Sequence, residues 1–166
     1  AISVTLERKG DLLCGVTYNP ITDELFTAER GQGAFLNNRR LRVAARKTLS
    51  DAVLAWGIPS IGEADRHDQF QRELARLQPK VAAIRQIGSA ELELAYVAAG
   101  RIDLMQGRGL EPWDTAAGIL MVREAGGIVT SAEGEKAPFD TGTVLAGNAD
   151  LVPLIKAEIA KARQGN

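Results

Sequence analysis

Residues 111–127 read EPWDTAAGILMVREAGG, a stretch that marks both the beginning and the end of one helix. Pro112 closes the preceding segment, and Asp114 is predicted to cap a helix that runs to Ala125 and stops at the two glycines that follow. A carboxylate at a helix start lies where backbone N–H groups and the helix dipole favour negative charge. Asp114 is therefore either a plain helix cap or a ligand directed into a site.

A second junction of the same kind lies upstream, at Gly88, Ser89 and Ala90. A strand is predicted to end at Gly88, and Ser89 is predicted to cap a helix through Ala99 whose first N–H groups are open to an anion or a hydroxyl. If the strands before the two junctions pair in parallel, both junctions open on the same crevice. An empty capped helix is the simpler interpretation of each junction taken alone.

The rest of the chain shows two different patterns. Residues 1–43 alternate apolar and polar side chains between tight turns, which predicts short antiparallel strands. Residues 50–166 alternate strand and helix patterns, which predicts an α/β domain. In this second part we expect strands at 53–56, 82–87, 102–105 and 144–146, and helices at 65–77, 89–99, 114–125 and from 151 onward. The predicted fold class is mixed α/β.

Length and composition exclude several classes of protein. The chain has 166 residues, 45% hydrophobic and 25% charged, with a net charge of −1. This balance suits a packed globular core. No block of like charge stands out, so direct nucleic-acid binding is not expected, and no apolar run is long enough for a membrane span. Because no signal-peptide layout is present either, we expect a cytoplasmic location.

Three side chains outside the two junctions are expected to have no part in chemistry. Cys14 is the only cysteine, which excludes an internal disulfide, and it is expected to be a small core residue. Glu91 and Glu93 are expected to face solvent on their helix.

Four stretches, in matching order and spacing, resemble the inositol monophosphatase family. They are residues 31–37 with 41–43, residues 85–90 with 95–100, residues 113–127, and Gly147-Asn148. The resemblance covers essentially the whole chain and implies a layered αβαβα sandwich. Residues 1–49 would be the remaining antiparallel strands of an N-terminal α+β domain, and residues 50–166 the C-terminal α/β domain.

The resemblance also implies a chemistry, the Mg²⁺-dependent hydrolysis of a small phosphorylated polyol or sugar by a homodimer. Asp114 matches the family's metal-binding Asp, whose carboxylate also reaches the substrate. Gly88, Ser89 and Ala90 match the stretch that contacts inositol hydroxyls. No further catalytic residue of the family is matched.

The chain departs from the family pattern at the metal cluster. The acidic segment that supplies most of the family's Mg²⁺ ligands is absent, and we expect it to lie upstream of Ala1. One Asp cannot assemble a Mg²⁺ site, so the 166 residues alone are not expected to hydrolyse phosphate esters. We also expect one sheet face to be bare, with Ile2, Val4 and Leu6 exposed.

A second departure concerns the substrate. Gly107 stands where the family often has a sugar-binding Glu, seven residues before Asp114. The neighbouring Arg108 suggests the hypothesis that a second anionic group is bound there instead.

The predicted function is phosphomonoester hydrolysis, with inositol monophosphate as the first expected substrate. One alternative is a sugar-bisphosphate or nucleotide-phosphate phosphatase of the same fold. The other is a non-catalytic module that binds a protein partner or dimerises.

Overall fold

The short alternating segments at the front of the chain pair into one antiparallel sheet, as predicted. The structure is a computed structural model that describes residues 1–58, 64–131 and 141–164. In these ranges the first sheet has the strands β1 (Ile2–Arg8), β2 (Asp11–Asn19), β3 (Glu24–Glu29), β4 (Gly33–Leu36) and β5 (Arg39–Arg40), paired in chain order. Lys9 and Gly10 join β1 to β2 with φ values of 56° and 83°, the left-handed conformation that a two-residue hairpin turn requires.

The second sheet combines parallel and antiparallel strands. Its order, among the described residues, is β7 (Ala83–Arg85), β6 (Val53–Trp56), β8 (Leu104–Arg108), β10 (Thr143–Gly147) and β9 (Ile128–Thr130). Strands β7 and β8 both run parallel to β6, whereas β10 is antiparallel to β8 and β9. The predicted strand at 102–105 begins later, at Leu104, and β9 was not predicted because it follows directly on a glycine turn.

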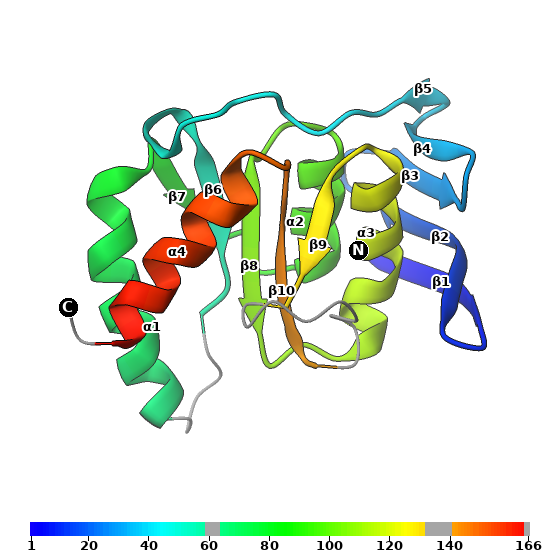
Figure 1. The fold of residues 1–166 in the computed structure, drawn as a ribbon. Coiled ribbons are helices and arrows are strands. Elements are labelled where there is room, and N and C mark those ends of the chain that lie inside the picture. The colour runs from blue at the N-terminus through cyan, green and yellow to red at the C-terminus, as the bar shows by residue number, and fades with distance from the viewer. Residues whose placement is uncertain (59–63, 132–140, 165–166) are drawn as a thin grey trace.

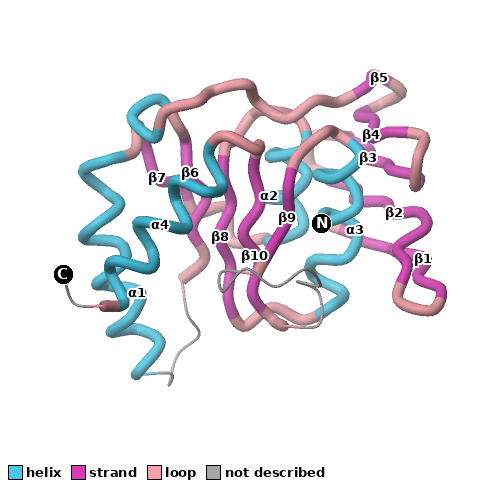
Figure 2. The backbone as a smooth tube through the Cα atoms, viewed as in Figure 1, coloured by secondary structure: helices cyan, strands magenta, loops and turns pink. Residues whose placement is uncertain are grey.

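The helices separate the sheets into layers (Figures 1 and 2). They are α1 (Ala64–Leu77), α2 (Ala90–Ala98), α3 (Pro112–Glu124) and α4 (Leu151–Arg163), with short 3₁₀ turns η1 (Leu49–Asp51) and η2 (Gln78–Lys80). Helices α2 and α3 lie between the two sheets, and α1 and α4 cover the other face of the second sheet. The described residues thus form a βαβα stack, which confirms the mixed α/β class. None of their helices has the length and apolar character needed to cross a bilayer.

The outer face of the first sheet is apolar and exposed. Ile2, Val4 and Leu6 on β1 are 59%, 63% and 55% exposed, which confirms the expectation for these residues. Leu6 pairs with Cys14 across the strands, so Cys14 also points outward. The prediction of a buried Cys14 is wrong, because β2 turns its other side, with Thr17, toward the helices.

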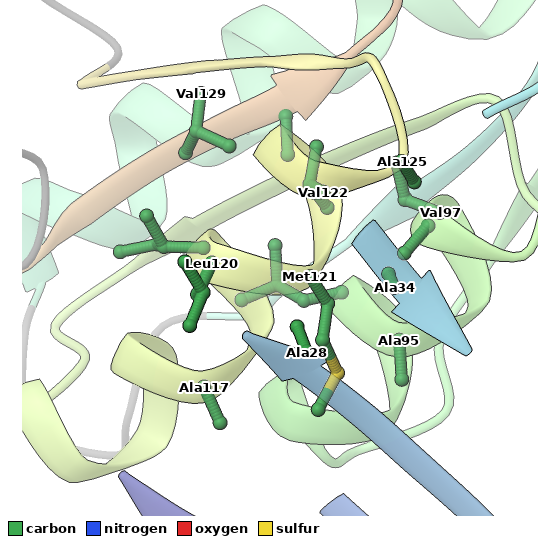
Figure 3. Packing of buried hydrophobic residues seen from close by; sticks show 14 of the residues in the cluster. Ala28, Ala34, Ala95, Val97, Ala117, Leu120, Met121, Val122, Ala125 and Val129 are labelled. Carbon is green, nitrogen blue, oxygen red and sulfur yellow. The ribbon is translucent and has the colours of Figure 1, made fainter. Parts of the chain in front are cut away.

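The main core lies between the first sheet and helices α2 and α3, and continues to the second sheet. Alanine is the commonest residue of this core, and Figure 3 shows Ala28 and Ala34 of the first sheet together with Ala95 and Ala117 of the helices. The approach is close enough that a Cβ on Gly15 would lie 2.9 Å from the Cα of Ala117. Small side chains therefore let the central helices sit directly on the first sheet.

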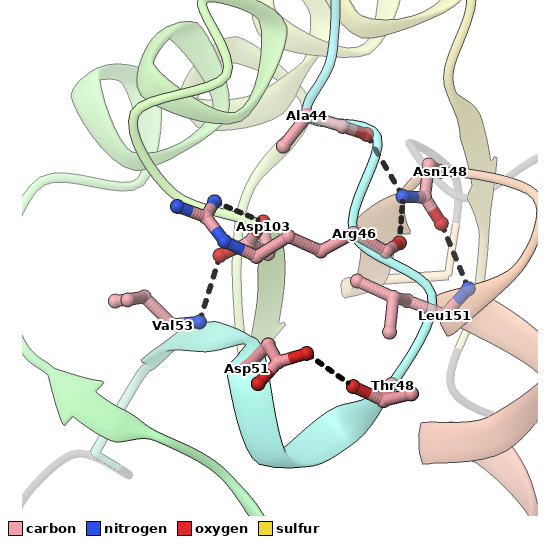
Figure 4. A network of polar contacts seen from close by, with 8 residues as sticks. All are labelled: Ala44, Arg46, Thr48, Asp51, Val53, Asp103, Asn148 and Leu151. Carbon is pink, nitrogen blue, oxygen red and sulfur yellow. Dashed lines mark hydrogen bonds and ion pairs between the residues drawn. The ribbon is translucent and has the colours of Figure 1, made fainter.

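Two buried polar side chains fix the segment that connects the sheets (Figure 4). The Asp103 carboxylate accepts hydrogen bonds from the Arg46 guanidinium and the Val53 N–H, both at 2.8 Å. The Asn148 amide donates to the backbone oxygens of Ala44 at 2.8 Å and Arg46 at 2.7 Å. The otherwise extended connection is thus held to one edge of the second sheet, where β6 and β8 begin and the antiparallel β10 ends.

Glu158 on α4 binds three cations, two from neighbouring elements and one from its own helix. Its carboxylate accepts hydrogen bonds from Lys80 at 2.6 Å, from Lys161 at 2.9 Å and from Arg76 at 2.9 Å. The bonds from Lys80 and Lys161 are the main cause that lowers the pKa of Glu158 to about 2.

This cluster predicts a specific loss of stability in acid. Because the folded pKa of Glu158 is below its usual value of 4.5, its contribution is complete above that value and is lost as the pH falls toward 2. In Glu158→Gln, the free energy of unfolding should fall less steeply between these pH values, as measured by urea titrations. Lys161→Met, which removes one of the three donors, should give an intermediate slope. An unchanged slope in Glu158→Gln would contradict the assignment.

Candidate functional site

A pocket of about 180 Å³ opens at the carboxyl ends of β6, β7 and β8. Because these three strands are parallel, the segments that follow them converge at one edge of the second sheet. The lining residues are Gly57, Ile58, Gln86, Gly88, Ser89, Ala90, Glu93, Met105, Gly107, Arg108 and Leu110. The three residues of the predicted 88–90 junction therefore line one pocket, together with Gly107 and Arg108.

The junction at residues 88–90 has the predicted local structure. Gly88 adopts a φ of 79°, which a residue with a side chain rarely does, and this turns the chain from β7 into α2. Ser89 is the N-cap of α2, where its hydroxyl accepts from the N–H of Leu92 at 3.4 Å and donates to Glu91 at 2.7 Å. The start of α2 thus lies at the pocket, and a helix start is suited to hydroxyl or anionic oxygens.

Glu93 is a pocket residue that the sequence analysis misplaced. Its side chain is not in solvent but 3% exposed, and it accepts from the N–H groups of Ile87 at 2.9 Å and Gly88 at 3.4 Å. Burial raises the pKa of the Glu93 carboxyl, and the two backbone bonds oppose this. A signal was present in the sequence, since Glu93 lies between Leu92 and Leu94 in a helix with apolar residues on all sides.

Asp114 occupies a different helix position from the one predicted. The N-cap of α3 is Glu111, and Pro112 is the first helical residue, so Asp114 is the third. Its carboxylate accepts the Glu111 N–H at 2.9 Å, reaching back over the first turn. The prediction of Asp114 as the cap is wrong because Pro112, which needs no N–H partner, starts the helix one turn earlier.

The starts of α2 and α3 lie at the same end of the molecule. Gly100 after α2 approaches Arg42, and the Val43 N–H donates to Ala125 after α3, so both helices end at the same connecting segment. The helices are therefore parallel, and Asp114 lies on the same side as the 88–90 pocket. In the described part of the chain, Asp114 does not line that pocket. Its neighbours Pro112 and Trp113 instead line a groove of about 310 Å³ beside β1.

Arg108 does not present a free positive charge to the pocket. Its two terminal nitrogens donate to Glu73 on α1 at 2.7 and 2.9 Å, and only 12% of its side chain is exposed. The hypothesis that Arg108 binds a second anionic group is wrong for this structure, because both nitrogens are already held by a buried carboxylate.

The described residues do not form a metal centre by themselves. Among residues 1–58, 64–131 and 141–164, no three His, Cys, Asp or Glu side chains are grouped so that they could hold an ion. A hard cation such as Mg²⁺ needs about six oxygens. Asp114 therefore fits as one ligand and not as a complete site.

Comparisons with known proteins give one consistent result. The sequence profile of the inositol monophosphatase family matches residues 1–166. An inositol-1-monophosphatase of Rhizobium meliloti is 52% identical over 161 residues, and one of Mesorhizobium japonicum is 51% identical over 148 residues. These matches cover 97% and 89% of this chain, but 60% and 55% of the two relatives. The chain thus spans less than two thirds of their length.

A solved structure supports the same relationship. The crystal structure of the extragenic suppressor protein suhB from Bartonella henselae superimposes with a TM-score of 0.90 at 48% sequence identity. The match covers 95% of this chain and 60% of the Bartonella chain.

Proposed function

This chain belongs to the inositol monophosphatase family, and from that premise we propose that it is part of a Mg²⁺-dependent phosphomonoester hydrolase whose main substrate is inositol monophosphate. The observation that carries the proposal is the parallel arrangement of α2 and α3. It brings the 88–90 pocket and the Asp114 carboxylate to one end of the molecule.

Each site residue has a proposed role. The backbone of Gly88 and Ala90 and the hydroxyl of Ser89 bind the hydroxyl groups of the polyol, since they line a pocket at a helix start. Asp114 supplies one Mg²⁺ ligand and reaches the substrate. The other ligands must come from outside the described residues, and no catalytic step is assigned to the described ones.

We further propose that the bare sheet face is covered in the whole protein. The exposed row of Ile2, Val4 and Leu6 has the apolar character of a face that packs on helices. An added helical layer there would complete the αβαβα sandwich, with residues 1–49 in the first domain and 50–166 in the second. A homodimer and a cytoplasmic location are part of the same proposal.

The test is made on the protein purified from its source cells. We expect an intact mass above 17.8 kDa and Mg²⁺-dependent phosphate release from inositol 1-phosphate. Asp114→Asn in that protein should lower the rate of phosphate release by about 100-fold or more, because removal of a metal ligand weakens the binding of Mg²⁺. Asp150→Asn, a change at an exposed position, should keep the rate. Mg²⁺-dependent hydrolysis that survives Asp114→Asn would contradict the assigned role.

The alternative substrates are tested by measuring the rate of phosphate release from inositol monophosphate, a sugar bisphosphate and a nucleotide phosphate. The substrate that is hydrolysed fastest decides between them.

The second candidate function, a non-catalytic binding module, is favoured by the exposed apolar face and by the absence of a three-residue acidic group in the described ranges. It predicts a native mass of 17.8 kDa and no saturable Mg²⁺ site in a calorimetric titration.

A further inference from the structure

A buried carboxylate that the proposed function does not use lies directly behind the pocket. Glu73 on α1 has a side chain that is 0% exposed. Its carboxylate accepts a hydrogen bond from each terminal nitrogen of Arg108: Nη1 donates to Oε2 at 2.7 Å and Nη2 to Oε1 at 2.9 Å. This paired geometry is the strongest that an arginine and a carboxylate form.

Glu73 is itself held in place by two further donors. The Gln69 amide donates to its Oε1 at 2.9 Å, and the Arg163 Nε donates to the same oxygen at 3.2 Å. Gln69 belongs to α1, Arg163 to the end of α4 and Arg108 to β8. The carboxylate is therefore the shared centre of three elements, and its position does not depend on Arg108 alone.

Without Glu73, the pocket would have the components of an anion site. Arg108 lines its wall, and Ser89 and Ala90 add the start of α2, where backbone donors and the helix dipole attract negative charge. With Glu73 in place, both terminal nitrogens of Arg108 donate hydrogen bonds to the buried carboxylate. Turning Arg108 toward a ligand would break a buried ion pair, which is strongly unfavourable. The Glu93 side chain in the same wall accepts hydrogen bonds from the N–H groups of Ile87 and Gly88, donors that an anion would otherwise use.

We propose that Glu73 is a positioning residue that holds the terminal nitrogens of Arg108 away from a ligand, so that this pocket selects an uncharged hydroxyl-bearing group over a second phosphate. The pocket's role as the polyol subsite rests on the proposed function. The pairing of Arg108 with Glu73 does not rest on the proposed function. Its effect on phosphate binding can be tested without hydrolysis or a metal ion.

The test is a titration of the ¹⁵N-labelled chain with inorganic phosphate, followed by NMR at the backbone amides of Ser89 and Gly107. The wild-type chain should show no saturable shift at these amides. Glu73→Gln keeps the size of the side chain and removes its charge, so phosphate should bind at least about tenfold more tightly. The gain should vanish in the double variant Glu73→Gln/Arg108→Met.

Two further variants separate this effect from general loosening of the fold. Arg163→Met removes a partner of Glu73 but leaves Arg108 paired, and should show no gain in phosphate binding. Arg108→Met should match the wild type, because in the wild type the terminal nitrogens of Arg108 are already held by Glu73. The proposal is overturned if folded Glu73→Gln binds phosphate no more tightly than wild type. If Glu73→Gln does not fold, a saturable wild-type phosphate shift that is lost in Arg108→Met overturns it equally.

Discussion

Asp103→Ala is expected to lower the free energy of unfolding by about 3 kcal/mol, because it removes a buried carboxylate with two partners. The Asp103 side chain is 0% exposed and holds the Arg46 guanidinium and the Val53 N–H, each at 2.8 Å (Figure 4). Arg46 is half-exposed and can turn to water, so most of the loss comes from the N–H at the start of β6. Urea denaturation followed by circular dichroism measures the change.

A nearby carboxylate provides the matched control. Asp51 accepts a hydrogen bond from Thr48 at 2.6 Å, but this pair is exposed, and Asp51→Ala should change the free energy of unfolding by less than about 1 kcal/mol. Asp103→Asn keeps the shape and an acceptor for Val53, and should fall between the two. Equal effects of Asp103→Ala and Asp51→Ala would show that burial of Asp103 does not carry the stability.

Gly118→Ala should lower the free energy of unfolding by about 2 kcal/mol, although alanine is the better helix former by about 1 kcal/mol. A Cβ at Gly118 would lie 2.4 Å from the Cβ of Leu94 and 2.7 Å from its Cδ1, so α2 and α3 must move apart. Because these two helices carry the 88–90 pocket and Asp114, the NMR signal of the Ser89 amide should also shift.

The control for this prediction is another glycine that has room for a methyl group. A Cβ on Gly57 would find its nearest atoms at 3.6 Å, an ordinary contact distance. Gly57→Ala should therefore stay within about 0.5 kcal/mol of the wild type. If both alanine variants were equally stable, the close packing of α2 on α3 would not be the reason for Gly118.

The sequence was most informative where a pattern is local. The cap at Ser89 and the end of α3 before Gly126 depend on residues within a few positions of each other, and both were predicted. The cap of α3 was predicted three residues too late, because two acceptable cap residues, Glu111 and Asp114, lie three residues apart. Local signals of similar strength compete there, and the proline decides between them.

Contacts between distant segments were not predictable in the same way. Glu73 and Arg108 are 35 residues apart, and Arg163 is 90 residues from Glu73. Each of the three, taken alone, resembles a charged residue on a surface. Only the packing of α1 and α4 on one face of the second sheet turns them into a buried cluster.

The sequence by itself determined the alternation of strands and helices apart from β9, the family and the junction at residues 88–90. Those properties follow from local periodicity, turn chemistry and motifs that are contiguous in the chain. The tertiary structure alone decided that Glu93 is buried, that Cys14 faces outward and that Arg108 is paired with Glu73. The physical reason is that burial and ion pairing depend on which faces meet, and the sheet register and the helix packing set those faces.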